Sequence, residues 1–233
     1  MRKELYVFRD RKPMKAEIRN YREADFAELI RIQRESFPPP FPEELLWNEE
    51  QLYNHVKRFP EGALCAMADG RIVGSVTGLL IGSEQSGTAH SWQEVTDAGY
   101  IRNHNPSGDT LYIADICVSP EYRKTGLGKW LMQSMYEVVV HLRLRRLLGG
   151  GRMPGYADAA AAFAETKEAG FLSAEQYLES VMKGERSDPV ISFLLRCGRT
   201  PVGVVPDYLE DEESMNYAAL MEWKNPFWNG GNQ

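Results

Sequence analysis

The most constraining feature of this sequence is a glycine-containing junction between an apolar segment and an amphipathic one. Leu111 to Val118 is apolar and has the length of a buried strand, and from Gly126 onward apolar residues recur at the spacing of a helix face. The segment Arg123-Lys124-Thr125-Gly126-Leu127-Gly128 lies between them. A strand that turns through such a loop into a helix predicts a domain built from both kinds of element.

The junction has the properties of an anion-binding site. Free N–H groups and the positive end of the dipole at the start of a helix favour anions, and glycines let a diphosphate approach the backbone. Arg123 and Lys124 add mobile positive charge. A Walker loop requires Ser or Thr where Trp130 stands, and a dinucleotide-binding fingerprint requires Gly where Leu131 stands. We therefore expect another phosphate-containing ligand, the alternative being a glycine-rich turn without a ligand.

The rest of the chain alternates between strand and helix patterns without an internal repeat. Expected strands cover Lys15–Tyr21, Ala63–Ala68, Arg71–Ile81, Leu111–Val118, Leu144–Leu148, Thr200–Val205 and Asn216–Trp223. Expected helices begin near Glu23, Asn48, Gly126, Ser173 and Asp188. Asp69-Gly70 predicts a hairpin between two of the strands. This order predicts a mixed α/β (α+β) fold with helices flanking a sheet.

Composition narrows the class of protein. The 233 residues suffice for a core without disulfide or metal support, and 27 basic against 33 acidic residues argue against nucleic-acid binding. The three cysteines are far apart in apolar runs and are expected to be reduced. Met1 to Lys15 lacks the apolar stretch of a signal peptide, and no run of roughly 18 apolar residues predicts a membrane span. We expect a cytoplasmic protein that does not bind a membrane.

The pattern Arg-x-x-Gly-x-Gly at residues 123–128, within Val118 to Lys129, resembles the coenzyme A loop of the GNAT family of N-acetyltransferases. The order of elements resembles that family over a core of about residues 16–223. The resemblance implies one domain over residues 1–233, with a mixed, mostly antiparallel central sheet. That sheet is expected to be splayed where Leu111–Val118 and Leu144–Leu148 diverge. Residues 83–109 and 149–187 then become insertions on the substrate side.

A narrower resemblance concerns four short segments. They are similar to acetyltransferase domains joined to carbon-nitrogen hydrolases, although no hydrolase domain is recognised here and the likeness identifies no substrate. The segments are His90-Ser91-Trp92, Asn103-His104-Asn105-Pro106, Arg152-Met153-Pro154-Gly155-Tyr156 and Asn216-Tyr217-Ala218.

The family resemblance implies transfer of an acetyl group from acetyl-CoA to an amine by direct attack in a ternary complex, without an acyl-enzyme or a metal. The N–H of Val118 is expected to stabilise the thioester oxyanion, and Cys117 to be a buried bystander. The acceptor is a small-molecule amine or a protein lysine, and a homodimer is one expected assembly. The residues expected to bind the coenzyme are Ile116, Cys117, Val118, Arg123, Lys124, Thr125, Gly126, Leu127, Gly128 and Lys129.

Asp115 is the first candidate for the catalytic base. An alkylamine is protonated at neutral pH and must lose a proton before it attacks. Asp115 interrupts an apolar strand, where it is expected to share a face with Leu111, Ile113 and Cys117, and a charge there is costly unless it is used. The alternatives are a structural ion pair and a carboxylate that orients the substrate.

The expected general acid is less well defined. The family often has a Tyr four residues before the Gly that follows the last helix, but here Leu194 precedes Gly198. Tyr208 is the candidate that replaces it, with Tyr156 and Tyr177 as alternatives, and an ordinary packed tyrosine remains open for each. The absent Tyr also keeps open a second function, a module that senses acetyl-CoA without turnover.

Four residues are candidates for binding the acceptor. His90 and His104 lie in the long irregular segment, Arg152 follows a run of glycines, and Tyr156 is close to it. The alternatives are solvated loop histidines and an arginine paired with a surface acid. None of the histidines has the spacing of a metal ligand, so no metal is expected.

Overall fold

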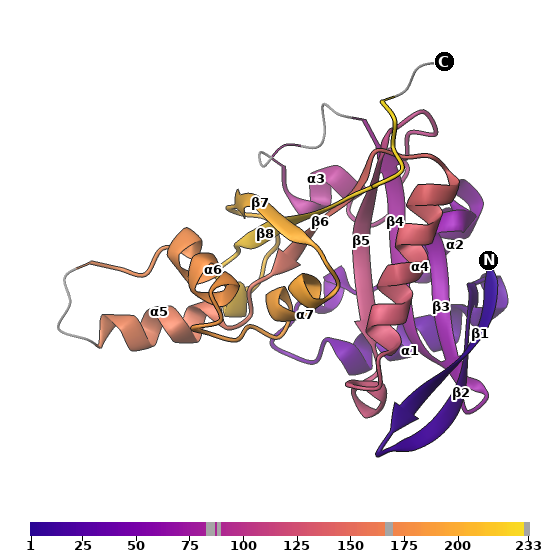
Figure 1. Ribbon diagram of the computed structural model, residues 1–233, viewed down its shortest axis with the longest axis horizontal. Coiled ribbons are helices and arrows are strands. Elements are labelled where there is room, and N and C mark those ends of the chain that lie inside the picture. The colour runs from indigo at the N-terminus through magenta and orange to yellow at the C-terminus, as the bar shows by residue number, and fades with distance from the viewer. Residues whose placement is uncertain (83–86, 88–89, 166–169, 231–233) are drawn as a thin grey trace.

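A single sheet organises the computed structural model, which describes residues 1–82, 87, 90–165 and 170–230 (Figure 1). Its strands follow the order β1-β2-β3-β4-β5-β6-β8-β7, and every neighbouring pair is antiparallel except β5 and β6. The strands are β1 (Arg2–Arg9), β2 (Lys12–Asn20), β3 (Ala63–Ala68), β4 (Arg71–Ile81), β5 (Thr110–Val118), β6 (Arg146–Arg152), β7 (Thr200–Val205) and β8 (Ala218–Lys224). The expected mixed, mostly antiparallel fold is confirmed.

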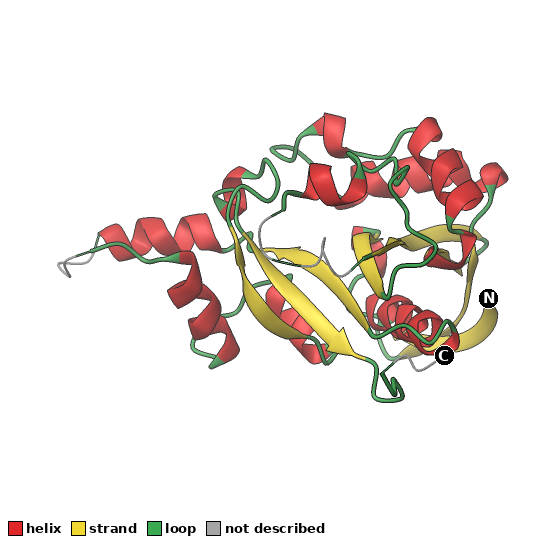
Figure 2. Ribbon diagram, turned by 90° about the horizontal axis from the view of Figure 1, so that it is seen from above, coloured by secondary structure: helices red, strands yellow, loops and turns green. Residues whose placement is uncertain are grey.

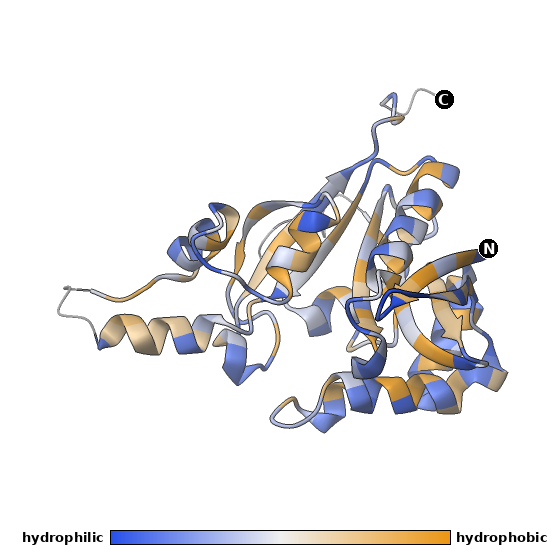
Figure 3. Cartoon of the chain, turned by 60° about the horizontal axis from the view of Figure 1, so that its bottom comes forward, coloured by the Kyte–Doolittle hydropathy of each residue, from blue (hydrophilic) through white to orange (hydrophobic). Residues whose placement is uncertain are grey.

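Helices cover both faces of this sheet (Figure 2). They are α1 (Phe26–Ser36), α2 (Glu49–Arg58), α3 (Trp92–Thr96), α4 (Leu127–His141), α5 (Tyr156–Ala164), α6 (Ala174–Met182) and α7 (Ile191–Arg196). A Cβ added to Gly74 or Gly78 of β4 would contact α4, which therefore packs on the face to which they point. Helix α1 packs on the opposite face, where Gln33 contacts Asp115. Figure 3 shows hydrophobic residues concentrated on the strands between these helices.

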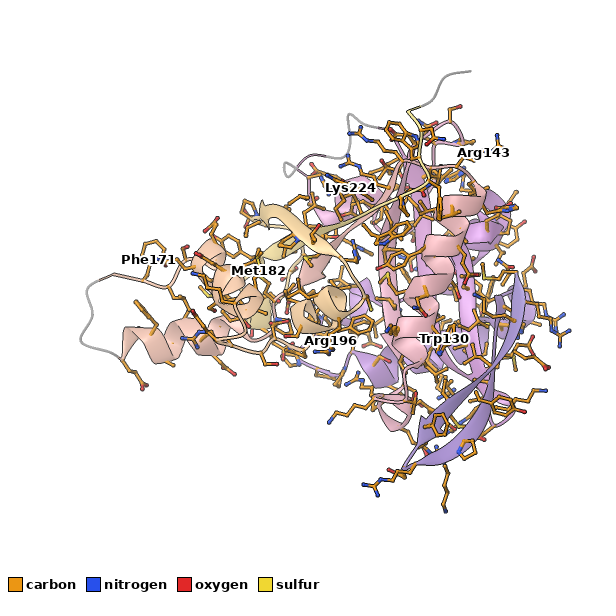
Figure 4. The ribbon with its side chains drawn as sticks, in the orientation of Figure 1. Trp130, Arg143, Phe171, Met182, Arg196 and Lys224 are labelled. Carbon is orange, nitrogen blue, oxygen red and sulfur yellow. The ribbon has the colours of Figure 1, made fainter. Side chains whose placement is uncertain are left out.

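Helices α5 and α6 form an arm that extends away from the sheet (Figure 1). Phe171 and Met182, labelled on this arm in Figure 4, are exposed. The base of the arm is held by Asp188, whose Oδ2 accepts from the hydroxyl of Tyr177 at 2.8 Å and whose Oδ1 accepts from the N–H groups at the start of α7. The expected helix-capping role of Asp188 is thus present. Part of each expected insertion, 83–109 and 149–187, lies outside the described residues.

Strands β5 and β6 separate after a short parallel ladder. Their pairing covers residues 110–112 with 146–148, after which each strand continues without the other. Strand β6 goes on to Arg152 because β8 pairs with it along its whole length, including Gly149, Gly150 and Gly151. The expected divergence of the two strands is confirmed. The expected end of this strand at Leu148 was wrong, because the glycine run is a paired part of it.

A β-bulge changes the direction of side chains in β5. Thr77 of β4 is opposite Asp115 and Gly78 is opposite Ile113, so Ala114 is an extra, unpaired residue. Side chains alternate along a strand, and the extra residue therefore puts Asp115 and Ile113 on opposite faces. Asp115 shares a face with Cys117, as expected, but not with Leu111 and Ile113. The bulge turns Asp115 toward α1.

Candidate functional site

A cavity of about 970 Å³ follows the gap between β5 and β6. This is in the size range of pockets that hold cofactors and small ligands. Its lining runs from Gly126 and Gly128 past Asp115 to Tyr208. A second cavity, of about 780 Å³, lies over the first three strands, but none of the predicted site residues lines it. The gap between β5 and β6 is therefore the candidate site.

The glycine loop at one end of this cavity has the backbone of an anion site. Gly126 is the residue before α4 and has a φ of 94°, and Lys124 has a φ of 64°. In the described part of the chain, none of the N–H groups from Lys124 to Lys129 donates to a protein acceptor. The hydroxyl of Thr125 donates to the Tyr122 carbonyl at 2.7 Å and stabilises the turn. A row of free donors at the start of a 15-residue helix favours a diphosphate.

Arg123 anchors this loop to the rest of the fold. Its Nη2 donates to the carbonyl of Ser36 at the end of α1 at 2.9 Å, and its Nε donates to the Val118 carbonyl at 3.3 Å. The expectation that Arg123 carries mobile charge was wrong, because these two bonds fix the guanidinium. Lys124 and Lys129 are exposed beside the glycines and also line the cavity.

Helix α7 faces the start of α4 across the cavity. A Cβ added to Gly128 would lie 3.3 Å from the ring of Phe193 in α7. Leu194, at the position where the family often has a Tyr, is buried and also lines the cavity. A side chain larger than that of Gly128 would narrow the space between the two helices.

The edge of β5 offers backbone donors to the cavity. The N–H of Ser119 donates to Val73 of β4 at 2.8 Å. Because N–H groups alternate in direction along a strand, those of Ile116 and Val118 point away from β4 and into the gap. Both residues line the cavity. The open strand edge can therefore pair with an extended ligand.

Asp115 lies at the bulge beside this edge. Burial raises its pKa to about 7, while hydrogen bonds from the Gln33 side chain and from the N–H of Ile116 oppose this increase. The Nε2 of Gln33 donates to Asp115 Oδ2 at 2.7 Å. Among the residues that the structure describes, no Lys, Arg or His forms an ion pair with Asp115. A carboxyl group that titrates near neutral pH can serve as a general base.

Gln33 lines the cavity, although the sequence indicated no role for it there. Its side chain is on the buried side of α1, in a row with Leu29 and Ile32. A buried amide requires hydrogen-bond partners, and the one amide in an otherwise apolar row was the available signal. Cys117 is also close to Gln33, and burial raises the pKa of its thiol to about 12. The thiol is therefore protonated at neutral pH, which agrees with the expectation of an unreactive cysteine.

Tyr208 reaches the cavity from the loop after β7. Its hydroxyl is 2.9 Å from the hydroxyl of Tyr112, which is in turn 3.0 Å from Nε2 of His90. Burial raises the pKa of Tyr208 to about 12. His90 thus connects to the cavity through two tyrosines and does not line it.

His104 and Tyr156 are not brought to the cavity. The Nδ1 of His104 accepts from the N–H of Leu80 at 3.1 Å, and its ring stacks on Phe59. The hydroxyl of Tyr156 donates to the Leu172 carbonyl at 2.8 Å at the base of the arm. Both side chains therefore support local structure here.

Arg152 lines the cavity but is already paired. Its guanidinium donates to both carboxylate oxygens of Asp211 at 2.6 Å and to Glu213 at 2.8 Å. It also lies over the ring of Phe41. Two protein carboxylates compensate its charge, as in the alternative of an arginine paired with an acid.

Two further residues of the cavity had no role in the sequence prediction. The indole N–H of Trp92 donates to the carbonyl of Ala114 at 2.9 Å and so supports the bulge. Arg199 is buried at the point where β5 and β6 separate. Arg199 follows a glycine at the end of a helix, and nothing in this pattern indicates burial.

In the residues that the structure describes, no group of three His, Cys, Asp or Glu side chains is arranged to hold a metal ion. Within the same part of the chain, no helix has the length and apolarity needed to cross a bilayer.

Comparison with known proteins identifies relatives over nearly the whole chain. The uncharacterized N-acetyltransferase YkwB of Bacillus subtilis (strain 168) is 56% identical over 226 residues, which are 97% of this chain and 96% of that protein. The probable hydrolase YhcX of the same organism is 38% identical over 209 residues, which are 89% of this chain but 38% of that protein. A match to part of a longer protein named as a hydrolase agrees with the second resemblance in the sequence.

Solved structures share the fold. The GphF GNAT-like decarboxylase in complex with isobutyryl-CoA has a TM-score of 0.69 at 21% identity and covers 89% of this chain and 98% of its own. The PaiA N-acetyltransferase from Thermoplasma acidophilum in complex with coenzyme A has a TM-score of 0.53 at 16% identity and covers 91% of this chain and 99% of its own. The sequence profile of the acetyltransferase (GNAT) family matches residues 26–171. With this match and the 56% identity to an N-acetyltransferase, the chain belongs to the GNAT acetyltransferase family.

Proposed function

We propose that this protein transfers an acetyl group from acetyl-CoA to an amine by direct attack in a ternary complex. The observation that carries the proposal is that the free N–H groups around Gly126 open into the same cavity as Asp115. One end of the cavity thus has donors for a diphosphate, and farther along β5 the cavity is lined by a carboxyl group with a pKa near 7.

In this proposal the coenzyme lies along β5. The amides from Lys124 to Lys129 hold its diphosphate, and the extended pantetheine arm lies along the open edge of β5. The coenzyme A ligands of the GphF and PaiA structures support a coenzyme of this kind. The width of the gap follows from the short ladder between β5 and β6.

The chemistry needs a base, an oxyanion donor and an acid. Asp115 accepts a proton from the ammonium group of the acceptor, directly or through one water. The neutral amine then forms a C–N bond with the thioester carbonyl while the N–H of Val118 stabilises the oxyanion. The C–S bond breaks, and the thiolate takes a proton from Tyr208. The surplus proton on the attached nitrogen then restores the hydroxyl of Tyr208, and Asp115 releases its proton to water. The products are an acetylated amine and free coenzyme A.

The acceptor would enter from the face to which Asp115 points. We propose that residues 83–109 and 149–187 form the acceptor side of a single domain, because Trp92 and Arg152 both line the cavity. A small-molecule amine and a protein lysine are both compatible with this entrance. An acceptor screen that includes both classes distinguishes them.

Calorimetry with acetyl-CoA and a thioester-cleavage assay with a panel of amines test the proposal. Wild type should bind acetyl-CoA, and Gly126→Trp should abolish binding because a large side chain would block the loop at a residue whose φ of 94° favours glycine. Asp115→Asn should retain binding and lose about 10²- to 10⁴-fold in kcat.

Two outcomes would contradict this proposal. Wild-type protein that does not bind acetyl-CoA would exclude the function. Binding without turnover of any amine would instead favour an acetyl-CoA sensor, the alternative that Leu194 suggests. Unchanged turnover in Asp115→Asn would remove only Asp115 from the mechanism.

A further inference from the structure

Arg199 is a buried cation in the lining of the cavity. It follows α7 directly, its exposed fraction is 2%, and it lines the cavity. Its Nη2 donates to the Gly149 carbonyl at 3.2 Å and to the Met221 carbonyl. A Cβ added to Gly149 would lie 3.3 Å from this Nη2 and 3.1 Å from Cβ of Ile113. Arg199 is therefore adjacent to the point at which β5 and β6 separate.

No carboxylate in the described part of the chain compensates the charge of Arg199. Among the described residues no carboxylate forms an ion pair with it, and its Nε is buried without a hydrogen-bond partner. Its polar neighbours are the hydroxyl groups of Tyr112, Tyr136 and Tyr208. Burial lowers its pKa to about 10, so the guanidinium remains charged at neutral pH. An unpaired buried charge is costly, and the missing partner is an anion that the cavity can admit.

Arg152 and Arg199 differ in whether protein carboxylates occupy their donors. Arg152 lines the same cavity, but Asp211 and Glu213 occupy its donors. Arg199 keeps an unused Nε, and a guanidinium presents its donors as a planar fork that matches a carboxylate. Arg152 and Arg199 both line the cavity, and of these two Arg199 is the one whose donors are not occupied by protein carboxylates.

The position of Arg199 identifies which part of the substrates would carry that carboxylate. The glycine loop and Arg199 mark opposite ends of the path along β5, with Val118 near the loop and Ile113 near Arg199. A thioester beside Val118 and Ile116 would direct its acyl chain toward Ile113 and Gly149. Asp115 points to the other face of the sheet because of the bulge, so the amine approaches from there.

We propose that the acyl pocket accepts an acyl group with a carboxylate at its far end, and that Arg199 binds this carboxylate. The inference rests on the proposed function and adds a second class of donor to acetyl-CoA, the coenzyme A thioester of a short dicarboxylic acid. The transfer step is unchanged: the amine forms the C–N bond, the C–S bond breaks, and the distal carboxylate takes no part.

Succinyl-CoA and butyryl-CoA test this inference because they have the same acyl length with and without the carboxylate. Calorimetry with both, and with acetyl-CoA, uses wild type, Arg199→Met and Arg199→Lys. Wild type should bind succinyl-CoA about 10- to 100-fold more tightly than butyryl-CoA, the range of a hydrogen-bonded charge pair. The ratio should fall to about one in Arg199→Met and stay intermediate in Arg199→Lys, which keeps the charge without the fork.

Arg143→Met is the matched control, because it removes the same charge from an exposed residue just beyond the carboxyl-terminal end of α4 (Figure 4). Its preference for succinyl-CoA should equal that of wild type. If Arg199→Met fails to fold, the ratio of affinities for succinyl-CoA and butyryl-CoA in wild type and in Arg199→Lys still tests the proposal.

The outcomes separate the two proposals. Equal affinities of wild type for succinyl-CoA and butyryl-CoA would overturn the dicarboxylic donor and leave the acetyl-CoA function in place. A preference for succinyl-CoA that persists in Arg199→Met would overturn the assignment to Arg199. Failure of all three thioesters to bind wild type would overturn the proposed function itself.

Discussion

The ionisation of Asp115 lowers the stability of the folded protein. Burial raises its pKa from 3.8 to about 7, so the folded protein holds this proton more tightly than the unfolded chain does. Losing the proton therefore costs stability as the pH rises from about 4 to about 7, and the full cost is present above that window. Buried charges without a cationic partner are rare outside functional sites.

We predict that Asp115→Asn is more stable than wild type at pH 8, by on the order of 1–4 kcal/mol, because it removes the cost of ionising this residue. The gain should be smaller at pH 5, where the folded protein keeps the carboxyl group neutral. Urea unfolding at both pH values measures the difference. Asp10→Asn, at an exposed turn residue, should change the free energy of unfolding by no more than about 0.5 kcal/mol.

A loss of stability in Asp115→Asn at pH 8 would mean that the carboxylate has a structural partner, as in the ion-pair alternative. Equal gains at both pH values would show that the effect does not come from ionisation.

Gln33 is predicted to position and tune Asp115. Its hydrogen bond to the carboxylate lowers the pKa of Asp115, in opposition to burial. Gln33→Leu should therefore raise this pKa and move the ascending limb of the kcat/KM profile to higher pH by about one unit. The measurement is the pH dependence of kcat/KM for the amine. Gln33→Glu should also raise the pKa, because a second carboxylate opposes ionisation.

A uniform fall in rate with an unmoved pH profile would assign Gln33 to packing alone. A matched control is Gln93→Leu, an amide outside the cavity lining.

The sequence was informative about single residues only where a residue type conflicts with its surroundings. Asp115 interrupts an apolar strand, and the glycines stand where a helix begins. Both features were therefore chosen as candidates, and both line the cavity. Arg199 follows a helix in a segment with ordinary polarity, and its burial depends on β6 and β8, which are distant in sequence. His104 and Tyr156 were expected to bind the acceptor from local patterns, which do not show that their polar atoms bond to Leu80 and Leu172.

At the scale of elements, β6 determines how closely Tyr208 approaches the gap. A Cβ added to Gly150 would lie 2.2 Å from the ring of Tyr208, a distance that no packed side chain accepts. Because Gly150 has no side chain, the ring of Tyr208 can pack directly against β6. In this position Tyr208 hydrogen-bonds to Tyr112. The expectation that this strand ends at Leu148 overlooked this role, because pairing with β8 keeps the glycine run extended.

Gly150→Ala is predicted to lower the free energy of unfolding by about 1–3 kcal/mol, because the methyl group overpacks against Tyr208. Turnover should fall with it, since the tyrosine must move. Urea unfolding and a thioester-cleavage assay measure the two effects. Gly87→Ala is the control, because no atom of the described residues lies within 4 Å of a Cβ there, and the free energy of unfolding should change by no more than about 0.5 kcal/mol. Full activity and stability in Gly150→Ala would show that Tyr208 has freedom to move.

Turn chemistry explains which elements the sequence predicted. The hairpin of β3 and β4 was predicted with correct bounds because Asp69-Gly70 is a strong turn signal. Strand β1 was missed, since its hairpin turn uses Asp10 and Arg11, both with positive φ, where glycine or asparagine is usual. Tyr6 and Phe8 are apolar but exposed, so the sequence of this strand lacks the alternation of polar and apolar residues that predicts a strand.

At the scale of the whole molecule, the sheet consists of two parts joined by one short ladder. Three residue pairs connect β5 to β6, and beyond them the cavity separates β5 and α4 from β6 and α7. A ligand in this gap would contact both parts. The number of ladder pairs was not predictable from sequence, because it depends on the relative twist of two strands that are joined through a helix.

Acetyl-CoA is therefore predicted to stabilise the whole fold. At about 100 times its Kd, a ligand that binds only the native state adds about 2.7 kcal/mol, which for a chain of this size raises Tm by roughly 5–10 °C. Hydrogen exchange should slow at the N–H group of Val118, which faces the gap, more than at Ser119, which is already bonded to β4. Gly126→Trp should show neither effect. A rise in Tm without protection at Val118 would place the ligand elsewhere on the protein, and equal protection of Val118 and Ser119 would indicate global stabilisation without contact between the ligand and β5.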